Sequence, residues 1–404
     1  MTLDARICAS DVIEPRLYRA AFIPALVALI VIAFSLQNRP SVLPQDSAAD
    51  ILFDEEVAAA SAARIAREFS DRRPGSPGDI AAAEQVAGEL AALGFEVTRD
   101  EFTVAEANLV NVVATRTGAD RDQIVVMAPR DALEGPEPTG SASDTATLIE
   151  LGRALQGRAP TKTLVLVSVD GESLGEAGVR RFIETAEDAS QIEAVLTTSQ
   201  LGAGPPSRPA LIAWSDDYRR GNLALELTTR QALRTEFPDL SGPPGIIDQV
   251  ARLALPIAPG AQGLLLGNGY DAVRISGAGE LDVPAVEGAA PDPERLGRFG
   301  RSMLQALSAL DAGELAPQEQ RSYLTVGRKV LPGWAVGLLG LSLILPALIA
   351  SIDASARARR RREPVGAWFA WLGRCCAPFV AALAVVLMLG LAGLALAPAS
   401  GAPS

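Results

Sequence analysis

Acidic residues at the end of an apolar run near the middle of the chain are the first candidates for chemistry. Leu164 to Val169 is short and rich in valine, which is typical of a strand buried on both faces of a sheet. Asp170 and Glu172 follow this run, and residues 176–187 then have the pattern of a helix. Carboxylates between a buried strand and a helix stand where open α/β sheets place their ligand sites.

The residue types that the sequence lacks limit this chemistry. The chain contains no histidine, which excludes catalytic triads with a histidine base and removes the commonest zinc ligand. Its cysteines, Cys8, Cys375 and Cys376, leave residues 9–374 without a disulfide or a thiolate metal site. The formal net charge of −12 argues against a nucleic-acid partner.

Other acids could join Glu172 at the same edge of a sheet. Asp131, Asp144 and Asp170 lie in polar segments beside predicted strands and helices, and carboxylate oxygens are suitable ligands for calcium or magnesium. One interpretation is a residual carboxylate cluster. The other, which we favour, is that these acids and Glu172 are solvated or hydrogen-bonded loop carboxylates, because polar loops at strand ends often carry unrelated acids.

The elements that must position these residues alternate between short apolar strands and amphipathic helices, which predicts an α/β domain with a mostly parallel sheet and helices on both faces. The predicted strands are residues 95–104, 109–115, 123–128, 164–169 and 193–198, and the resemblance described below implies a further strand at 269–275. The predicted helices are residues 54–69, 79–93, 145–156, 176–187, 222–234, 246–253 and 293–310.

Several of these segments carry a family resemblance. The loop Asp170-Gly171-Glu172-Ser173-Leu174-Gly175-Glu176-Ala177-Gly178 resembles the Asp-Gly-Glu-Glu-x-Gly-x-x-Gly signature of the di-zinc aminopeptidases, peptidase family M28. The helix after Arg-Pro-Gly-Ser-Pro-Gly at residues 73–78 and the helix at 145–156 are also similar to those of the family. The resemblance implies a three-layer, aminopeptidase-like domain over residues 54–311.

The resemblance also implies a zinc site, and here the sequence departs from the family. Glu172 matches the general base. The matched ligand positions hold Pro129, Gly140, Ser173, Ser199 and Asp282. Only Asp282 among them has an ordinary zinc-ligating side chain. We therefore predict that zinc is absent and that Glu172 is vestigial, as in the inactive members of the family.

Apolar segments at both ends of the chain predict a multi-pass protein of the cell membrane. A short arginine-rich loop between two spans favours the cytoplasm, which puts the main domain on the external side. The predicted order is a cytoplasmic tail (1–19), a span (20–36), a linker (37–53), the domain (54–311), a linker (312–330), a span (331–352), a basic cytoplasmic loop (353–375), a span (376–397) and an external tail (398–404).

Three functions remain open from the sequence. The first is a non-catalytic pseudo-peptidase that binds or scaffolds a membrane or envelope protein partner at the bilayer. The second is an active metallo-aminopeptidase with an atypical site. The third is a subunit of a membrane or envelope complex in which the C-terminal helices are the working part. A family fold does not decide among them.

Overall fold

The computed structural model describes residues 22–45, 51–133, 135, 137–186, 188–205, 207–240, 242–256, 260–281, 289–316, 318, 322–360 and 365–391. The chain divides into two compact units. One is Arg39–Ser322, and the other combines Met1–Asn38 with Tyr323–Ser404. Each is described by itself.

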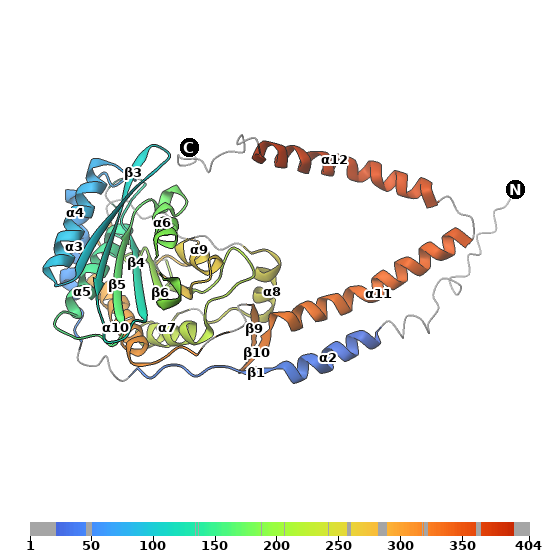
Figure 1. The fold of residues 1–404 in the computed structure, drawn as a ribbon, viewed down its shortest axis with the longest axis horizontal. Helices are drawn as coiled ribbons and strands as arrows, with labels where there is room; N and C mark the ends of the chain where they lie inside the picture. The colour runs from blue at the N-terminus through green and yellow to red at the C-terminus, as the bar shows by residue number, and fades with distance from the viewer. Residues whose placement is uncertain are drawn as a thin grey trace. The chain divides into compact units, whose positions relative to one another are not determined.

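The Arg39–Ser322 unit is built on one seven-stranded sheet (Figure 1). Its strands are β2 (Glu96–Val104), β3 (Ala107–Arg116), β4 (Gln123–Pro129), β5 (Thr163–Val169), β6 (Ile192–Ser199), β7 (Ala210–Ile212) and β8 (Ala272–Ser276). The spatial order is β2-β3-β5-β4-β6-β8-β7. The central strands β5, β4, β6 and β8 run parallel, whereas β3 and β7 pair with their neighbours in antiparallel fashion.

Helices cover both faces of this sheet and complete a three-layer architecture. One face carries α3 (Glu55–Glu68), α4 (Pro77–Ala92), α5 (Ser141–Ala154), α7 (Leu223–Glu236) and α10 (Pro293–Ala312). The other face carries α6 (Ala177–Thr185) and α9 (Ala261–Gly267). Three further short helices are η3 (Glu172–Leu174), η4 (Ala189–Gln191) and α8 (Ile246–Ala254).

The central strands are apolar at almost every position because both of their faces are covered. In β4, Ile124 and Val126 pack into the core under the first helical layer, and Val125 and Met127 pack into the core on the opposite face. The same alternation runs along β5. The strands therefore read as continuous apolar runs, which is the pattern of a parallel sheet enclosed by helices.

The predicted mixed α/β fold with a mostly parallel central sheet is confirmed. Each predicted strand and helix of the domain has a counterpart whose bounds differ by a few residues. The sequence analysis did not predict β7 or α9, which are only 3 and 7 residues long. Short elements carry too few residues to establish a periodicity.

The second unit contains a small antiparallel sheet and apolar helices. Its strands are β1 (Gln37–Asn38), β9 (Tyr323–Val326) and β10 (Lys329–Pro332), in the order β1-β10-β9. Its helices are α2 (Ile23–Ser35), α11 (Gly333–Arg360) and α12 (Val365–Leu391). Strands β1 and β9 and the first two residues of β10 lie in segments for which the sequence predicted a linker, and Leu331 and Pro332 of β10 lie in the predicted span.

The structure supports one of the three predicted membrane spans. Within the described residues one helix, α11, is long and apolar enough to cross a bilayer, with a mean hydropathy of 2.3 over 18 residues. Helix α2 has 13 residues, about 20 Å at 1.5 Å per residue, because the backbone turns extended at Leu36. Helix α12 has 27 residues, and its described apolar stretch covers residues 370–382. Residues 20–21 and 392–397 of the predicted spans lie outside the described residues.

The predicted basic loop at 353–375 is also largely helical. Helix α11 continues to Arg360, and α12 begins at Val365. Two features favour this extension of α11: its last turn carries Arg357, Arg359 and Arg360, and Asp353 pairs with Arg357 one turn later. Cations in the last turn interact favourably with the helix dipole.

Candidate functional site

The carboxyl ends of β5, β4 and β6 meet at one edge of the sheet and bring the predicted site together. Pro129 at the end of β4 is in register with Val169 at the end of β5, and the Arg130 N–H continues the ladder to the Val169 carbonyl at 2.9 Å. Ser199 ends β6. Gly140 immediately precedes α5, and Glu172 and Ser173 form the start of η3. Asp282 lies outside the described residues.

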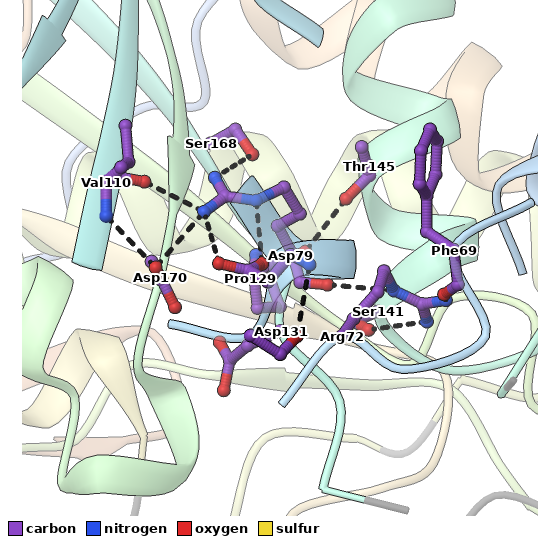
Figure 2. Close-up of polar contacts among 12 residues, drawn as sticks. Phe69, Arg72, Asp79, Val110, Pro129, Asp131, Ser141, Thr145, Ser168 and Asp170 are labelled. Carbon is purple, nitrogen blue, oxygen red and sulfur yellow. Dashed lines mark hydrogen bonds and ion pairs between the residues drawn. The ribbon is translucent and has the colours of Figure 1, made fainter. Parts of the chain in front are cut away.

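A buried arginine, Arg130, lies at this edge. Figure 2 shows the residues around it, among them Asp79, Asp170 and Val110. The Arg130 guanidinium is fully buried and donates two hydrogen bonds to Asp79, from Nε to Oδ1 at 2.9 Å and from Nη2 to Oδ2 at 3.0 Å. Nη2 also donates to the Val110 carbonyl at 2.8 Å and lies 3.3 Å from Asp170 Oδ2. Burial lowers the pKa of Arg130, but Asp79 and Asp170 raise it further, so the guanidinium remains charged.

The start of α4 places Asp79 against this arginine. Pro77 stands in the first turn, and Ser76 Oγ caps the helix by accepting the Asp79 backbone N–H at 3.2 Å. The Asp79 side chain is 0% exposed, although an acid in a first helical turn is more often a solvated partner of the helix dipole. The cap therefore fixes the carboxylate that pairs with Arg130.

Asp170 is a second buried carboxyl in this network. Its Oδ2 accepts the Val110 N–H at 3.0 Å, and among the described residues its buried Oδ1 has no hydrogen-bond partner. The side chain also interacts with Asp79. Burial is the main reason that the pKa of Asp170 rises to about 8, and Arg130 opposes part of that rise. Asp170 is therefore protonated at neutral pH, which lets it share a proton with the Asp79 carboxylate.

Arg72 is a second buried cation on the other side of Arg130. Its Nε donates to the Arg130 carbonyl at 3.2 Å, and its Nη1 donates to the Phe69 carbonyl at 2.9 Å. Burial lowers the pKa of Arg72, while Glu137 and Asp79 act in the opposite direction. Glu137 also occupies the space beside Gly140, because a Cβ at Gly140 would lie 2.9 Å from Glu137 Oε2.

Asp131 anchors the loop that carries Glu172. Its Oδ1 accepts the Glu172 N–H at 2.9 Å, and its Oδ2 accepts the Ser173 N–H at 3.2 Å and the Ser173 hydroxyl at 3.0 Å. Burial raises the pKa of Asp131, and these hydrogen bonds lower it in part. Ser173, at a predicted ligand position, is therefore a donor to a neighbouring carboxylate.

Asp144 anchors the loop that follows β6. Its Oδ2 accepts the Gln200 N–H at 2.7 Å, and its Oδ1 accepts the Leu201 N–H at 3.0 Å. Both amides follow Ser199 directly, so Asp144 anchors the loop after β6 as Asp131 anchors the loop after β5. Carboxylates that accept backbone N–H groups in this way are satisfied without a cation.

The structure thus brings the predicted acids to one sheet edge but gives them separate partners. Asp131 and Asp144 bind backbone amides of different loops, and Asp170 belongs to the Arg130 network. In the part of the chain that the structure describes, no group of three or more His, Cys, Asp or Glu side chains is arranged to hold a metal ion. Pro129 contributes only its carbonyl, which accepts from the Thr145 hydroxyl at 3.0 Å.

Four buried residues of this site, two of them arginines, were not predicted from the sequence. Arg72, Arg130, Asp79 and Asn111 are all buried. Asn111 Oδ1 accepts the Asp170 N–H at 3.2 Å, and its Nδ2 donates to the Gly178 carbonyl at 2.8 Å. The only signal in the sequence was a charged residue, Arg130, directly after an apolar strand, and that pattern also describes an ordinary loop.

Comparisons with known proteins agree with this fold. Residues 111–233, which include β4, α5 and β5, match the profile of peptidase family M28. No curated protein matches the sequence.

Solved structures are similar over 64% of the chain at low identity. A zinc aminopeptidase from Bacillus subtilis has a TM-score of 0.54 and 11% identity, covering 64% of this chain and 95% of that one. A glutaminyl cyclase from Porphyromonas gingivalis and a leucine aminopeptidase precursor from Bacteroides thetaiotaomicron each have a TM-score of 0.51 and 14% identity, covering 64% of this chain and 98% of theirs. Identities this low show a shared fold only. Residues 111–233 thus resemble peptidase family M28, and the fold resembles that of zinc aminopeptidases and glutaminyl cyclases.

Proposed function

We propose that this chain is a non-catalytic member of its family, which binds or scaffolds a membrane or envelope protein partner at the bilayer. One observation carries the proposal. At the strand ends where the family resemblance expects zinc, the buried charge is an internal ion-pair network centred on Arg130 with Asp79 and Asp170.

The charge balance of this network favours a metal-free site. A zinc pair brings a large positive charge and needs anionic or imidazole ligands to hold it. The Asp79 carboxylate already pairs with Arg130, Asp170 Oδ2 lies 3.3 Å from the same guanidinium, and Asp131 and Asp144 accept backbone amides. A cation added here would have to displace the guanidinium or those amides, because an unpaired buried charge is costly.

The four predicted ligand positions within the described residues support the same conclusion. Pro129 and Gly140 have no ligating side chain, and Ser173 donates its hydroxyl to Asp131. The neutral hydroxyl of Ser199 is a weak zinc ligand. A Glu172 carboxylate without a metal-bound water has no activated nucleophile to deprotonate.

The membrane part of the proposal keeps the predicted topology. Helix α11 is the strongest span, and residues 20–36 and 376–397 are proposed to complete a three-span arrangement with the Arg39–Ser322 unit outside. The arginine-rich stretch at the end of α11 supports a cytoplasmic position for that end of the helix.

A metal measurement on the intact protein tests this function. Full-length chain purified in detergent without chelator is expected to contain zinc far below one ion per chain. Stoichiometric zinc, one or two ions per chain, would overturn the proposal, because it would require ligands that the strand ends do not offer.

An activity measurement separates the proposal from an active aminopeptidase with an atypical site. Release of a chromogenic amine from aminoacyl substrates is expected to be absent, and Glu172→Gln is expected to change nothing. The matched control is Glu176→Gln, which removes another acid of the same loop. Activity that is lost with Glu172→Gln and kept with Glu176→Gln would show that the chain is an enzyme.

A further inference from the structure

Helix α8 exposes its apolar side chains, whereas a surface helix usually turns such side chains toward the core. Ile246, Ile247 and Val250 are 49%, 84% and 44% exposed. Ala251 and Ala254 are exposed as well. These five positions are spaced i, i+1, i+4, i+5 and i+8, so they form one stripe along the helix.

The opposite face of α8 is polar and faces the protein. Gln249 is 1% exposed, its Oε1 accepts from Arg220 Nη1 at 3.1 Å, and its Nε2 donates to the Pro244 carbonyl at 2.9 Å. Arg252 pairs with Glu280, and its guanidinium carbon lies 5.3 Å from the centre of the Trp214 ring. The polar contacts therefore fix which way the helix faces.

The exposed stripe leaves apolar area of α8 that the described residues do not cover. A nine-residue helix is not stable in water by itself, so α8 depends on its inner contacts and on whatever covers its outer stripe. Burying one isoleucine side chain contributes about 1.5–3 kcal/mol. Contiguous apolar surface of this kind marks contact with a protein or a membrane.

The position of the unit along the chain favours a membrane. Arg39, where the unit begins, is four residues after the end of α2 at Ser35, and Gly333, where α11 begins, is eleven residues after Ser322. Even fully extended, these connections reach only about 14 Å and about 40 Å. A tether this short keeps a lipid surface at a high local concentration for any apolar stripe on the unit.

We infer that the outer stripe of α8, formed by Ile246, Ile247, Val250, Ala251 and Ala254, lies in the interface of the bilayer that holds α11. The inference rests on the proposed membrane anchoring. A helix of this kind lies parallel to the surface with its apolar face about 5–10 Å into the boundary of headgroups and acyl chains. The Arg39–Ser322 unit would then be held in one orientation on the membrane by α8 as well as by its tethers.

Depth-dependent quenching in vesicles tests the inference on the full chain. All three native cysteines lie outside Arg39–Ser322, so a cysteine-free background needs only Cys8→Ser, Cys375→Ser and Cys376→Ser. A polarity-sensitive fluorophore is attached through Ile247→Cys, and the chain is reconstituted in phosphatidylcholine with and without brominated acyl chains. Bromine in the acyl chains is expected to reduce the emission at position 247 at least about twofold, as for an interfacial side chain.

Two matched labels make the result decisive. Ala92→Cys, at the exposed end of α4 in the same unit, is expected to show no quenching by brominated lipid. Leu343→Cys, on an exposed side chain within α11, reports the span itself and is expected to be quenched strongly.

The pattern of quenching at positions 343, 247 and 92 tests the α8 contact separately from the membrane anchoring. Quenching at 343 and 247 but not at 92 supports the inference. Quenching at 343 alone overturns the α8 contact and leaves the anchoring intact, and energy transfer between labels at 247 on two chains would then identify a second copy as the cover. Absence of quenching at 343 overturns the anchoring and the inference with it.

Discussion

The Arg130 guanidinium contacts the Asp79 carboxylate through two hydrogen bonds of 2.9 and 3.0 Å, with both side chains 0% exposed. The two residues are 51 positions apart, on the end of β4 and the start of α4. This pair joins the first helical layer to the sheet edge where the family resemblance expects metal. A buried pair is costly to break, because removing one partner leaves the other charge unpaired.

Arg130→Met is expected to destabilise the unit by about 3–5 kcal/mol, because it leaves Asp79 buried without its cation. Denaturant unfolding, followed by the fluorescence of Trp214 after the other tryptophans are changed to Phe, measures the loss. The matched control is Arg73→Met, because Arg73 and Asp71 form the same two-bond geometry with side chains 69% and 50% exposed. The control is expected to leave the midpoint unchanged.

The triple variant Asp79→Asn, Arg130→Met, Asp170→Asn is expected to recover part of that loss, because no charge is then left unpaired in the site. Equal destabilisation in the single and the triple variant would mean that packing of the arginine, rather than its charge, stabilises this edge.

Asp170 predicts a specific pH dependence of stability. Its pKa is about 8 in the folded chain against an ordinary 3.8, so the folded state binds more protons than the unfolded state between these values. The stability contributed by the protonated carboxyl is complete below about pH 4 and is lost as the pH rises toward 8, by at most about 1.4 kcal/mol per pH unit.

Asp170→Asn imitates the protonated carboxyl and removes the titration. Denaturant midpoints at pH 5 and pH 8 are expected to differ less in this variant than in the unaltered chain. Asp131, whose pKa burial also raises, contributes with the same sign in both proteins, so the comparison isolates Asp170. If the denaturant midpoint changed equally with pH in the two proteins, the raised pKa of Asp170 would be contradicted.

Asp131→Ala is expected to loosen the loop of Glu172, because the Glu172 and Ser173 amides lose their acceptor. The expected cost is about 1–3 kcal/mol. Hydrogen exchange of these two amides should accelerate more than that of the sheet.

A matched control exists in η4, where Asp188 accepts the Ser190 N–H at 3.1 Å in the same type of short helix but in an exposed position. Asp188→Ala should accelerate exchange locally and leave global stability unchanged. If the two variants lowered the global stability equally, Asp131 would have no special role in it.

Gly178→Ala is expected to destabilise the unit by about 1–3 kcal/mol through overpacking. A Cβ at Gly178 would lie 2.4 Å from the Asp170 carbonyl oxygen and 2.5 Å from Asn111 Oδ1, and neither can withdraw without disturbing the sheet edge. Gly88 in α4 is the control, because its Cβ would meet nothing within 4 Å. Gly88→Ala should stabilise by about 0.5–1 kcal/mol through helix propensity, and thermal midpoints of both variants decide the comparison.

The sequence by itself determined the elements of the fold and the limits of the chemistry. Strands such as β4 and β5 are apolar at successive positions because both faces are covered, and this pattern is local and visible in the sequence. The absence of histidine likewise needs no coordinates. The sequence also located α8 to within one residue of its end.

Only the tertiary structure decided which partners the charged residues have and which way α8 faces. Asp131 and Asp144 could be read as a cation cluster until their backbone donors on other loops were known, and Arg130 could be read as a loop residue until Asp79 was placed beside it. Periodicity reports that a helix has two faces, but the inner one is chosen by long-range contacts such as Gln249 with Arg220. The pairing of buried charges is a property of residues far apart in sequence, and for that reason local patterns do not contain it.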